Sequence, residues 1–365
     1  MTESRFDYQA RLGRLRGQMA DRSVDVVMLS VGSDLPYFTG YEAMPLERLT
    51  MLVVPTTGDC ALFVPQLEAP RVEPGPFEMI AWAETEDPVR LVSRFAGDAR
   101  HVAIGDHTWS TFLLGLQAAM PGAAWSVASR LTKPLRMRKE PAEIGLLRKA
   151  AEGVDRVLTR APLELRFSGR TEREVARDFQ EMTLAEGHDQ AWSAIIASGP
   201  NGASPHHEPG DRVIEEGDLI VCDFGGRVGG YYSDVTRTFA VGDPGARRLE
   251  AHGLVLAANE AARAAVAPGV PCQEIDRAAR RVIEEGGHGE HFIHRTGHGI
   301  GLEGHEHPYM VEGNDLELEE GMTFSVEPGI YVPGEFGVRI EDIVACGESG
   351  VDDLNLADRA LVDVS

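Results

Sequence analysis

The stretch DFGGRVGGYYSD, residues 223–234, places one aspartate at each end of a glycine-rich segment. Apolar runs flank it on both sides, so we predict two antiparallel strands joined by a tight turn. A two-residue loop at Val228 and Gly229 would set Asp223 directly opposite Asp234, with Cβ atoms about 4.5–5.5 Å apart. Because like charges repel across a strand pair, we expect a positive group between them.

The end of the chain repeats this arrangement in FSVEPGIY (324–331) and VRIEDIV (338–344). A loop centred on Gly334 would place Glu327 opposite Glu341. Arg339 lies two positions before Glu341 and faces the same side of a strand. We therefore expect Arg339 to hold the carboxylate of Glu341 in place.

Each of these acids, taken alone, would most often be a surface residue. Here they are embedded in apolar runs, where carboxylates are rarely buried unless they are paired or bind a metal. Four carboxylates in two facing pairs would suit two divalent cations about 3.5–4 Å apart.

Histidines are concentrated in HRTGHGIGLEGHEHP (294–308). His298 stands between two glycines, and one imidazole added to four carboxylates suits Mn²⁺, with Co²⁺, Zn²⁺ or Fe²⁺ as alternatives. We expect functional roles for His305 and for His206, which lies in a turn-rich loop before the first hairpin. Plain hydrogen-bonding or solvated roles are expected for the other loop and helix histidines considered: His207, His252, His288 and His307.

Composition limits the class of protein. The 365 residues carry a net charge of −23, which disfavours nucleic acid and anionic membranes as partners. The four cysteines form no CxxC pair and are expected to be buried in a reducing compartment. The N-terminal segment lacks the features of a signal peptide, and no apolar run is long enough to span a bilayer. We expect a cytoplasmic protein.

The order of predicted elements indicates two domains. A predicted amphipathic helix at 5–22 is followed by strands that alternate with helices, typical of an α/β domain. The basic, proline-containing segment 131–143 is interpreted as the connection, although a loop and strand inside one domain is an alternative. The predicted domains are residues 1–133 (α/β) and 134–365, whose strands and helices come in blocks, an α+β pattern.

The ordered set of Asp223, Asp234, His298, Glu327 and Glu341 resembles the metal-ligand pattern of the M24 or "pita-bread" metallopeptidases. These include methionine aminopeptidase, aminopeptidase P and prolidase. The flanking sequences also match: SGPNGASPHH, DFGGRVGGYYSDVTRTF, HRTGHGIGLEGHE, VEPGIY and VRIED. The α/β segment ahead of them resembles the creatinase/prolidase N-terminal domain, which favours the Xaa-Pro branch.

The resemblance implies a role for each residue. Asp223 would bind one metal, Asp234 and Glu341 would bridge two metals, and His298 and Glu327 would bind the second. His206 would lie near the scissile nitrogen and His305 near the substrate carbonyl. Two more residues are expected to line or support the substrate site: His294 and Arg339.

The implied activity is hydrolysis of Xaa-Pro bonds in short peptides by a metal-bridging hydroxide, with Glu327 relaying the proton. A Xaa-Pro dipeptidase is the first expectation. Aminopeptidase P and a hydrolase of a non-peptide substrate remain alternatives within the family. A non-enzymatic binding module and a Ca²⁺-stabilised structural domain are the alternatives outside it. A homodimer is expected because relatives are often dimers.

Overall fold

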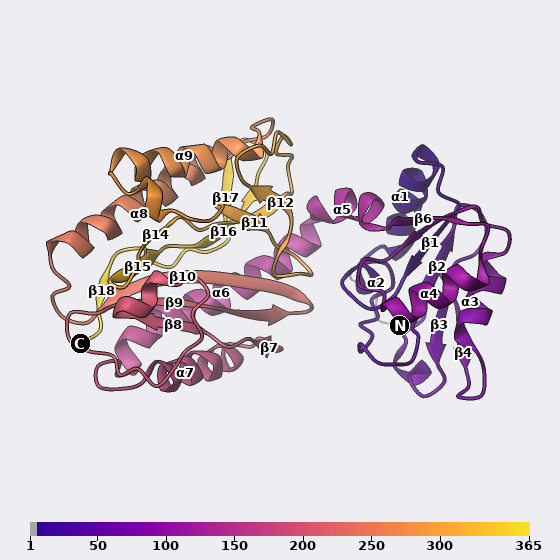
Figure 1. Ribbon diagram of the computed structural model, residues 1–365, viewed down its shortest axis with the longest axis horizontal. Helices are drawn as coiled ribbons and strands as arrows, with labels where there is room; N and C mark the ends of the chain where they lie inside the picture. Colours follow the sequence, from indigo (N-terminus) through magenta and orange to yellow (C-terminus); the bar gives the residue numbers. More distant parts are fainter. Residues whose placement is uncertain (1–5) are drawn as a thin grey trace. The chain divides into compact units, whose positions relative to one another are not determined.

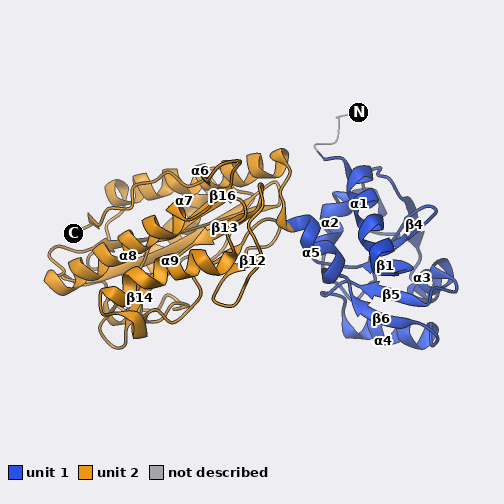
Figure 2. Cartoon of the chain, turned by 90° about the horizontal axis from the view of Figure 1, so that it is seen from above, with its two compact units in different colours: residues 1–136 blue, residues 137–365 orange. Residues whose placement is uncertain are grey.

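The computed structural model describes residues 6–365 and divides into two compact units, one up to Arg136 and one from Met137 (Figure 2). The predicted first helix is α1 (Tyr8–Asp21), and residue 5 of the predicted range lies outside the described residues. The segment 131–143 forms the end of one helix, α5, and the start of the next, α6, with no strand between them.

The first unit is an α/β domain built on one six-stranded sheet of order β4-β3-β2-β1-β5-β6 (Figure 1). β2 runs antiparallel to β1 and β3, and the other neighbours are parallel. The strands are β1 (Val26–Leu29), β2 (Met51–Pro55), β3 (Ala61–Pro65), β4 (Glu78–Trp82), β5 (His101–Ile104) and β6 (Ala124–Val127). The helices after α1 are α2 (Asp34–Thr39), η1 (Ala69–Arg71), α3 (Pro88–Ala96), α4 (Ser110–Ala119) and α5 (Ser129–Met137).

The first five strands lie on apolar runs that the sequence predicts. The edge strand β6 was not predicted. Its end residues are exposed and its middle residues are only half-buried, so it lacks an apolar run. An edge strand needs little hydrophobic patterning, because only one side of its backbone pairs with the sheet.

The second unit is α+β and contains two larger sheets and a separate strand pair. The first sheet contains β7 (Gln190–Ala191), β8 (Ile195–Ser198), β9 (Leu219–Val228), β10 (Tyr231–Ala240) and β18 (Val362–Asp363). The second contains β11 (Gly297–Gly299), β12 (Glu306–Met310), β13 (Thr323–Val326), β16 (Asp342–Cys346) and β17 (Val351–Asp353). The pair is β14 (Gly329–Val332) and β15 (Phe336–Arg339).

Helices cover the two sides of this unit, with α6 and α7 on one side and α8 and α9 on the other (Figure 1). Each helix pair has its own core, because apolar residues of α6 and α7 pack against β8–β10 and those of α8 and α9 pack against β13–β16. The bounds are α6 (Pro141–Glu164), α7 (Glu172–Ala185), α8 (Ala246–Ala264) and α9 (Cys272–Glu285), with short η2 (Gly199–Ala203) and η3 (Gly289–His291). The functional side chains described below lie on the strands and loops between these layers.

Several local predictions are confirmed. α7 begins after Thr171, which forms the predicted capping box with Glu174. All four cysteines are buried and free. Among residues 6–365, no helix combines the length and the apolarity needed to cross a bilayer.

The register predicted for the first hairpin is wrong by two positions. The turn lies at Gly229-Gly230, so Asp234 pairs with Gly225 and Asp223 pairs with Thr236. The reason is the turn: both of these glycines have positive φ (57° and 88°), as a two-residue hairpin loop of type I′ requires. A β-branched Val228 adopts such a conformation poorly. The shift preserves the face, so Asp223 and Asp234 are diagonal neighbours on the same side of the sheet.

The second predicted register is present, but it is interrupted where the acids lie. β14 and β15 pair around a turn with Gly334, and β13 and β16 continue the same register. Between these two ladders the pairing stops at Glu327 and Glu341. The backbone N–H of Glu341 donates instead to the carbonyl of Thr236 on β10 (3.0 Å), so this residue joins the first hairpin.

The loop that begins with η2 lies directly on β15. A Cβ atom added at Gly337 would lie 1.7 Å from the carbonyl oxygen of Gly202, and one added at Gly202 would lie 2.8 Å from the backbone nitrogen of Gly337. Moving either segment away would break its backbone hydrogen bonds. The close contact therefore requires glycine at both positions.

We therefore expect Gly337→Ala to destabilise the protein by about 1–3 kcal/mol, the usual cost of overpacking. The matched control is Gly253→Ala on α8, where an added Cβ meets nothing within 4 Å. That change should stabilise the helix by about 0.5–1 kcal/mol. Urea unfolding monitored by circular dichroism measures both, and equal effects of the two substitutions would contradict the assigned contact.

Candidate metal centre

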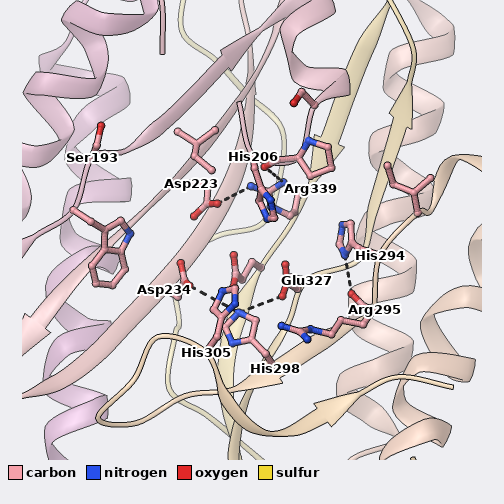
Figure 3. Close-up of a pocket in the computed structure, with 16 residues that line it drawn as sticks. Ser193, His206, Asp223, Asp234, His294, Arg295, His298, His305, Glu327 and Arg339 are labelled. Atoms are coloured by element: carbon pink, nitrogen blue, oxygen red, sulfur yellow. Dashed lines mark hydrogen bonds and ion pairs between the residues drawn. The ribbon is translucent and has the colours of Figure 1, made fainter. Parts of the chain in front are cut away.

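Five predicted ligands converge on one pocket of about 790 Å³ in the second unit (Figure 3). They come from separate elements: β9, β10, β11, the segment after β13 and the segment before β16. In chain order they are Asp223, Asp234, His298, Glu327 and Glu341. Residues 118 positions apart in the sequence are thus brought together by the antiparallel ladders of two hairpins and one short strand.

The ligand atoms form three overlapping groups, and within each group they lie within 4.8 Å of one another. The groups are Asp223, Asp234 and Glu341; His298, Glu327 and Glu341; and Asp234, His298 and His305. Glu341 and Asp234 each belong to two groups. His305, which was predicted to contact substrate rather than metal, lies against His298 with 3.7 Å between ring centroids.

The carboxylates of this cluster repel one another in a buried setting. Burial raises the pKa of Asp234 well above its usual range, and the charges of Asp223 and Glu327 add to this. Burial, followed by the charges of Asp234 and Glu327, likewise raises the pKa of Glu341. Both carboxyls therefore resist ionisation unless cations are present.

One oxygen of the cluster has no protein partner. Glu341 is 2% exposed, and among residues 6–365 its Oε1 accepts no hydrogen bond. Its other oxygen, Oε2, accepts from the hydroxyl of Thr236 at 2.8 Å. A buried anionic oxygen without a donor is costly, whereas a cation would satisfy it. The residues present therefore fit a site for two divalent cations.

His298 is prepared as a neutral ligand. Its Nδ1 lies 3.1 Å from the carbonyl of Gly299, which makes this nitrogen the donor and leaves Nε2 directed at the acids. Nε2 lies 3.3 Å from Oε1 of Glu327 and 4.0 Å from Oδ2 of Asp234. Burial lowers the pKa of His298 to about 4, so the ring is uncharged at neutral pH.

Arg339 does not hold Glu341 directly, contrary to the prediction. It is 3% exposed and pairs with Asp223, with 2.7 Å between Nη2 and Oδ2 (Figure 3). Its Nε donates to the hydroxyl of Thr236 (3.1 Å), which in turn donates to Glu341. Both side chains line the same pocket, but the guanidinium of Arg339 pairs with Asp223 on the other hairpin and reaches Glu341 only through Thr236.

His294 lines the pocket and is linked through Tyr331 to Arg339. Nε2 of His294 lies 2.8 Å from the hydroxyl of Tyr331, which accepts a hydrogen bond from Arg339 at 2.9 Å. Tyr331 was not predicted, although the register predicted for the second hairpin places it diagonally from Arg339. The signal was present in VEPGIY, where alternation puts Tyr331 on the face of Gly329.

His206 lies on the pocket lining with its neighbour Pro205, as the sequence led us to expect of a loop residue beside the acids (Figure 3). Arg295 also lines the pocket and was not predicted. Its guanidinium stacks over the ring of Tyr309, 4.1 Å from the centroid, and forms no ion pair with any described acid. The sequence signal was its place between His294 and His298.

Comparisons with known proteins agree with this geometry. The family pattern described as Metallopeptidase family M24 matches residues 145–348, and the Creatinase/Prolidase N-terminal domain matches residues 11–138. The chain belongs to metallopeptidase family M24. The expected M24 fold, a creatinase/prolidase-like α/β domain followed by an α+β pita-bread domain, is confirmed.

Three relatives show how far the likeness extends within the M24 family. The chain is 42% identical to a probable dipeptidase PepE of Mycobacterium tuberculosis over 374 residues, covering 100% of this chain and 99% of that protein. The crystal structure of dipeptidase PepE from Mycobacterium ulcerans is 40% identical, with a TM-score of 0.91 over 99% of this chain and 100% of that one. A prolidase from Thermococcus sibiricus is 36% identical, with a TM-score of 0.93 over 98% and 99%.

Because the carboxylates repel one another, replacing one of them should raise the stability of the metal-free protein and lower its affinity for Mn²⁺. Glu341→Gln should stabilise the metal-free protein by ~1 kcal/mol or more, because it removes a buried charge that has an unsatisfied oxygen. A carboxyl with a raised folded-state pKa destabilises the fold most above that pKa; the penalty shrinks as the pH falls below the folded-state pKa and is gone below the unfolded-state pKa. The same substitution should weaken Mn²⁺ binding at least about 10-fold.

Thermal unfolding of the metal-free protein and calorimetric titration with Mn²⁺ measure the two effects. Glu335→Gln, at an exposed turn residue paired with Arg247, is the control for loss of one negative charge. Lower stability of the metal-free Glu341→Gln protein, or unchanged Mn²⁺ affinity, would refute this interpretation of the cluster.

Proposed function

We propose that this protein is a Xaa-Pro dipeptidase that hydrolyses short proline-containing peptides with two divalent cations, Mn²⁺ first among the candidates. The observation that carries this proposal is a cluster of four carboxylates, buried or half-buried, with the buried His298 in a pocket of an M24 chain. Oxygen-rich ligand sets with one imidazole suit Mn²⁺, and Co²⁺, Zn²⁺ or Fe²⁺ remain alternatives. The names of its relatives, dipeptidase PepE and prolidase, support the substrate class.

In this proposal, one cation is held by Asp223 and the other by His298 and Glu327, while Asp234 and Glu341 bridge them. Asp234 and Glu341 are each grouped once with Asp223 and once with His298, which supports their bridging roles. When bound, the cations would lower the pKa of a water molecule and polarise the peptide carbonyl. Arg339 and Thr236 keep Asp223 and Glu341 oriented by their hydrogen bonds.

The chain's own residues would then move the protons. Glu327 is the proposed general base, because its Oε1 is fixed by the hydroxyl of Ser325 (3.1 Å) and faces His298. His305, exposed beside the cluster, is placed to donate to the oxygen that becomes negative during attack. His206, on the pocket lining, would assist the departing proline nitrogen, while His294 lines the substrate site.

One observation favours a dipeptidase over an aminopeptidase. Arg295 presents a guanidinium to the pocket without an acidic partner among the described residues, beside Ile293 and His294. A free guanidinium pairs well with a carboxylate, and the C-terminus of a dipeptide supplies one next to the scissile bond. A longer peptide has an amide there instead. We therefore assign Arg295 to the C-terminal carboxylate, which keeps aminopeptidase P as the second candidate.

Two finer expectations belong to this proposal. The enzyme is expected to act in the cytoplasm and to form a homodimer. Sedimentation velocity at micromolar concentration tests the dimer, and a monomer under assay conditions would remove that part. A metal-free binding module is disfavoured, since the residues that would hold the cations are all in place.

Chelation should abolish hydrolysis of Ala-Pro, and Mn²⁺ should restore it. Glu327→Gln should lower kcat by about 100-fold or more, since it removes both a metal ligand and the proposed base. Steady-state kinetics with measured metal content separates the two losses. Glu320→Gln, a glutamate outside the pocket, is the control. Wild-type kcat in the Glu327→Gln enzyme would exclude its role as base.

The dipeptidase assignment predicts how Arg295 variants choose substrates. Arg295→Met should reduce kcat/KM for Ala-Pro by about 10–100-fold, the scale of one charge-assisted hydrogen bond, and should reduce it much less for Ala-Pro-amide. Arg295→Lys should retain part of the activity. The matched control is Arg281→Met on the exposed side of α9. Equal losses on the two substrates would instead favour an aminopeptidase or an unrelated role.

A further inference from the structure

A fully buried carboxylate outside the metal pocket accepts hydrogen bonds from five donor groups of a single loop. Glu172, in the first turn of α7, is 0% exposed. Its Oε1 accepts from the backbone N–H and the hydroxyl of Ser198, both at 2.8 Å, and from the amide of Asn201 at 3.0 Å. Its Oε2 accepts from Nε2 of His207 at 2.8 Å and from the N–H of Gly210 at 3.2 Å.

The donors overcome the cost of burying this charge. Burial by itself raises the pKa of Glu172, but the hydrogen bonds from Ser198, Asn201 and His207 bring the pKa below its usual range. The side chain is therefore an anion at neutral pH, and no lysine or arginine among residues 6–365 pairs with it. Each donor comes from the segment 198–210, so the negative charge is satisfied only when this loop adopts its observed path.

Glu172 is not needed to cap the N-terminus of its own helix. The N-terminus of α7 is already capped by Thr171 and Glu174, whose side chains bond each other's backbone N–H groups. Both oxygens of Glu172 instead point away from the helix to the loop. This carboxylate neither caps its own helix nor pairs with a lysine or arginine. Its simplest role is to hold the loop that donates to it.

That segment carries a residue of the pocket. His206 lies inside the loop, between the donors Asn201 and Gly210 and directly before His207. On its other side the loop is fixed by Arg339, whose Nη1 donates to the carbonyl of Pro205 at 3.3 Å, and by the backbone contact with Gly337. The loop is thus held from both sides, with His206 between the attachment at Pro205 and the attachment at His207.

The other half of the unit contains a similar arrangement for a metal-cluster residue, in which the acid also pairs with Arg280 at 2.9 Å. Asp276 on α9, 1% exposed, accepts from the backbone N–H and the hydroxyl of Thr296 at 2.9 and 2.8 Å. Thr296 stands two residues before His298. In both halves, a buried helix acid captures the N–H and the hydroxyl of one residue on the segment that leads to a pocket histidine.

We propose that Glu172 is a positioning residue for hydrolysis: it holds the loop 198–210 so that His206 faces the substrate. This inference rests on the proposed function for the role of His206, but the anchoring itself does not. Glu172 acts through the loop and does not touch the cations, so metal binding should not depend on it.

The experiment compares Glu172→Gln with Glu174→Gln. The two make the same chemical change two residues apart in one helix turn, and Glu174 serves the helix cap alone. Glu172→Gln should lower kcat/KM for Ala-Pro by about 10-fold or more, with unchanged Mn²⁺ affinity. Glu174→Gln should keep the capping box, because glutamine also serves at this position, and should leave kcat/KM near the wild-type value.

A double-mutant cycle with His206→Ala separates positioning from general weakening. If Glu172 acts through His206, the double variant should be no slower than His206→Ala alone. Fully multiplicative losses would overturn the proposal, as would equal kinetic effects of Glu172→Gln and Glu174→Gln.

Hydrogen exchange of the substrate-free protein provides a readout that does not need activity. Amides of residues 199–210 should exchange faster in Glu172→Gln than in Glu174→Gln, with the β9–β10 hairpin unchanged. Unchanged exchange in the loop would refute the anchoring. A wild-type enzyme that cleaves no Xaa-Pro substrate would refute the proposed function, and the exchange result would still decide whether Glu172 holds the loop.

Discussion

Electrostatic repulsion among buried carboxylates is the constraint around which the second unit is arranged. Asp234 and Glu341 lie in a setting that raises the pKa of each, and Glu341 keeps one oxygen without a donor. An apolar core of this kind tolerates such a cluster only when cations neutralise it. Arg339 supplies one positive charge, at Asp223, and the remaining negative charge requires metal.

Much of the fold follows from patterns in the sequence, because strands and helix ends are set by local chemistry. The capping box at Thr171 and Glu174, the central strands and the glycine-rich hairpin were all predictable. The exact register was not, since it depends on which glycine pair forms the turn. A shift of one residue in the turn moved Asp223 from Asp234 to Thr236 and still left the two aspartates on one face.

The sequence was sufficient to predict which residues form the cluster, but less so which contacts they make. Ordered acids and a histidine with their flanking sequences identified the cluster, whereas the partner of Arg339, Asp223, lies on the other hairpin and is not revealed by alternation along one strand. Tyr331 and Glu172 were missed for a related reason. Each acquires its meaning from a neighbour distant in sequence, such as His294 or the loop 198–210, and only the folded chain brings these together.

The interrupted hairpin also has a mechanical meaning. Because Glu341 leaves its own ladder and bonds to Thr236, a backbone hydrogen bond joins the two large sheets beside the pocket, next to the ion pair of Arg237 with Asp342. Cations held between Asp223 on the first sheet and Glu327 beside the second would then act as a non-covalent cross-link between the two halves. Binding or loss of the ions would change how rigidly the two halves are joined. The rigidity of the second unit would therefore depend on the same ions as its catalytic activity.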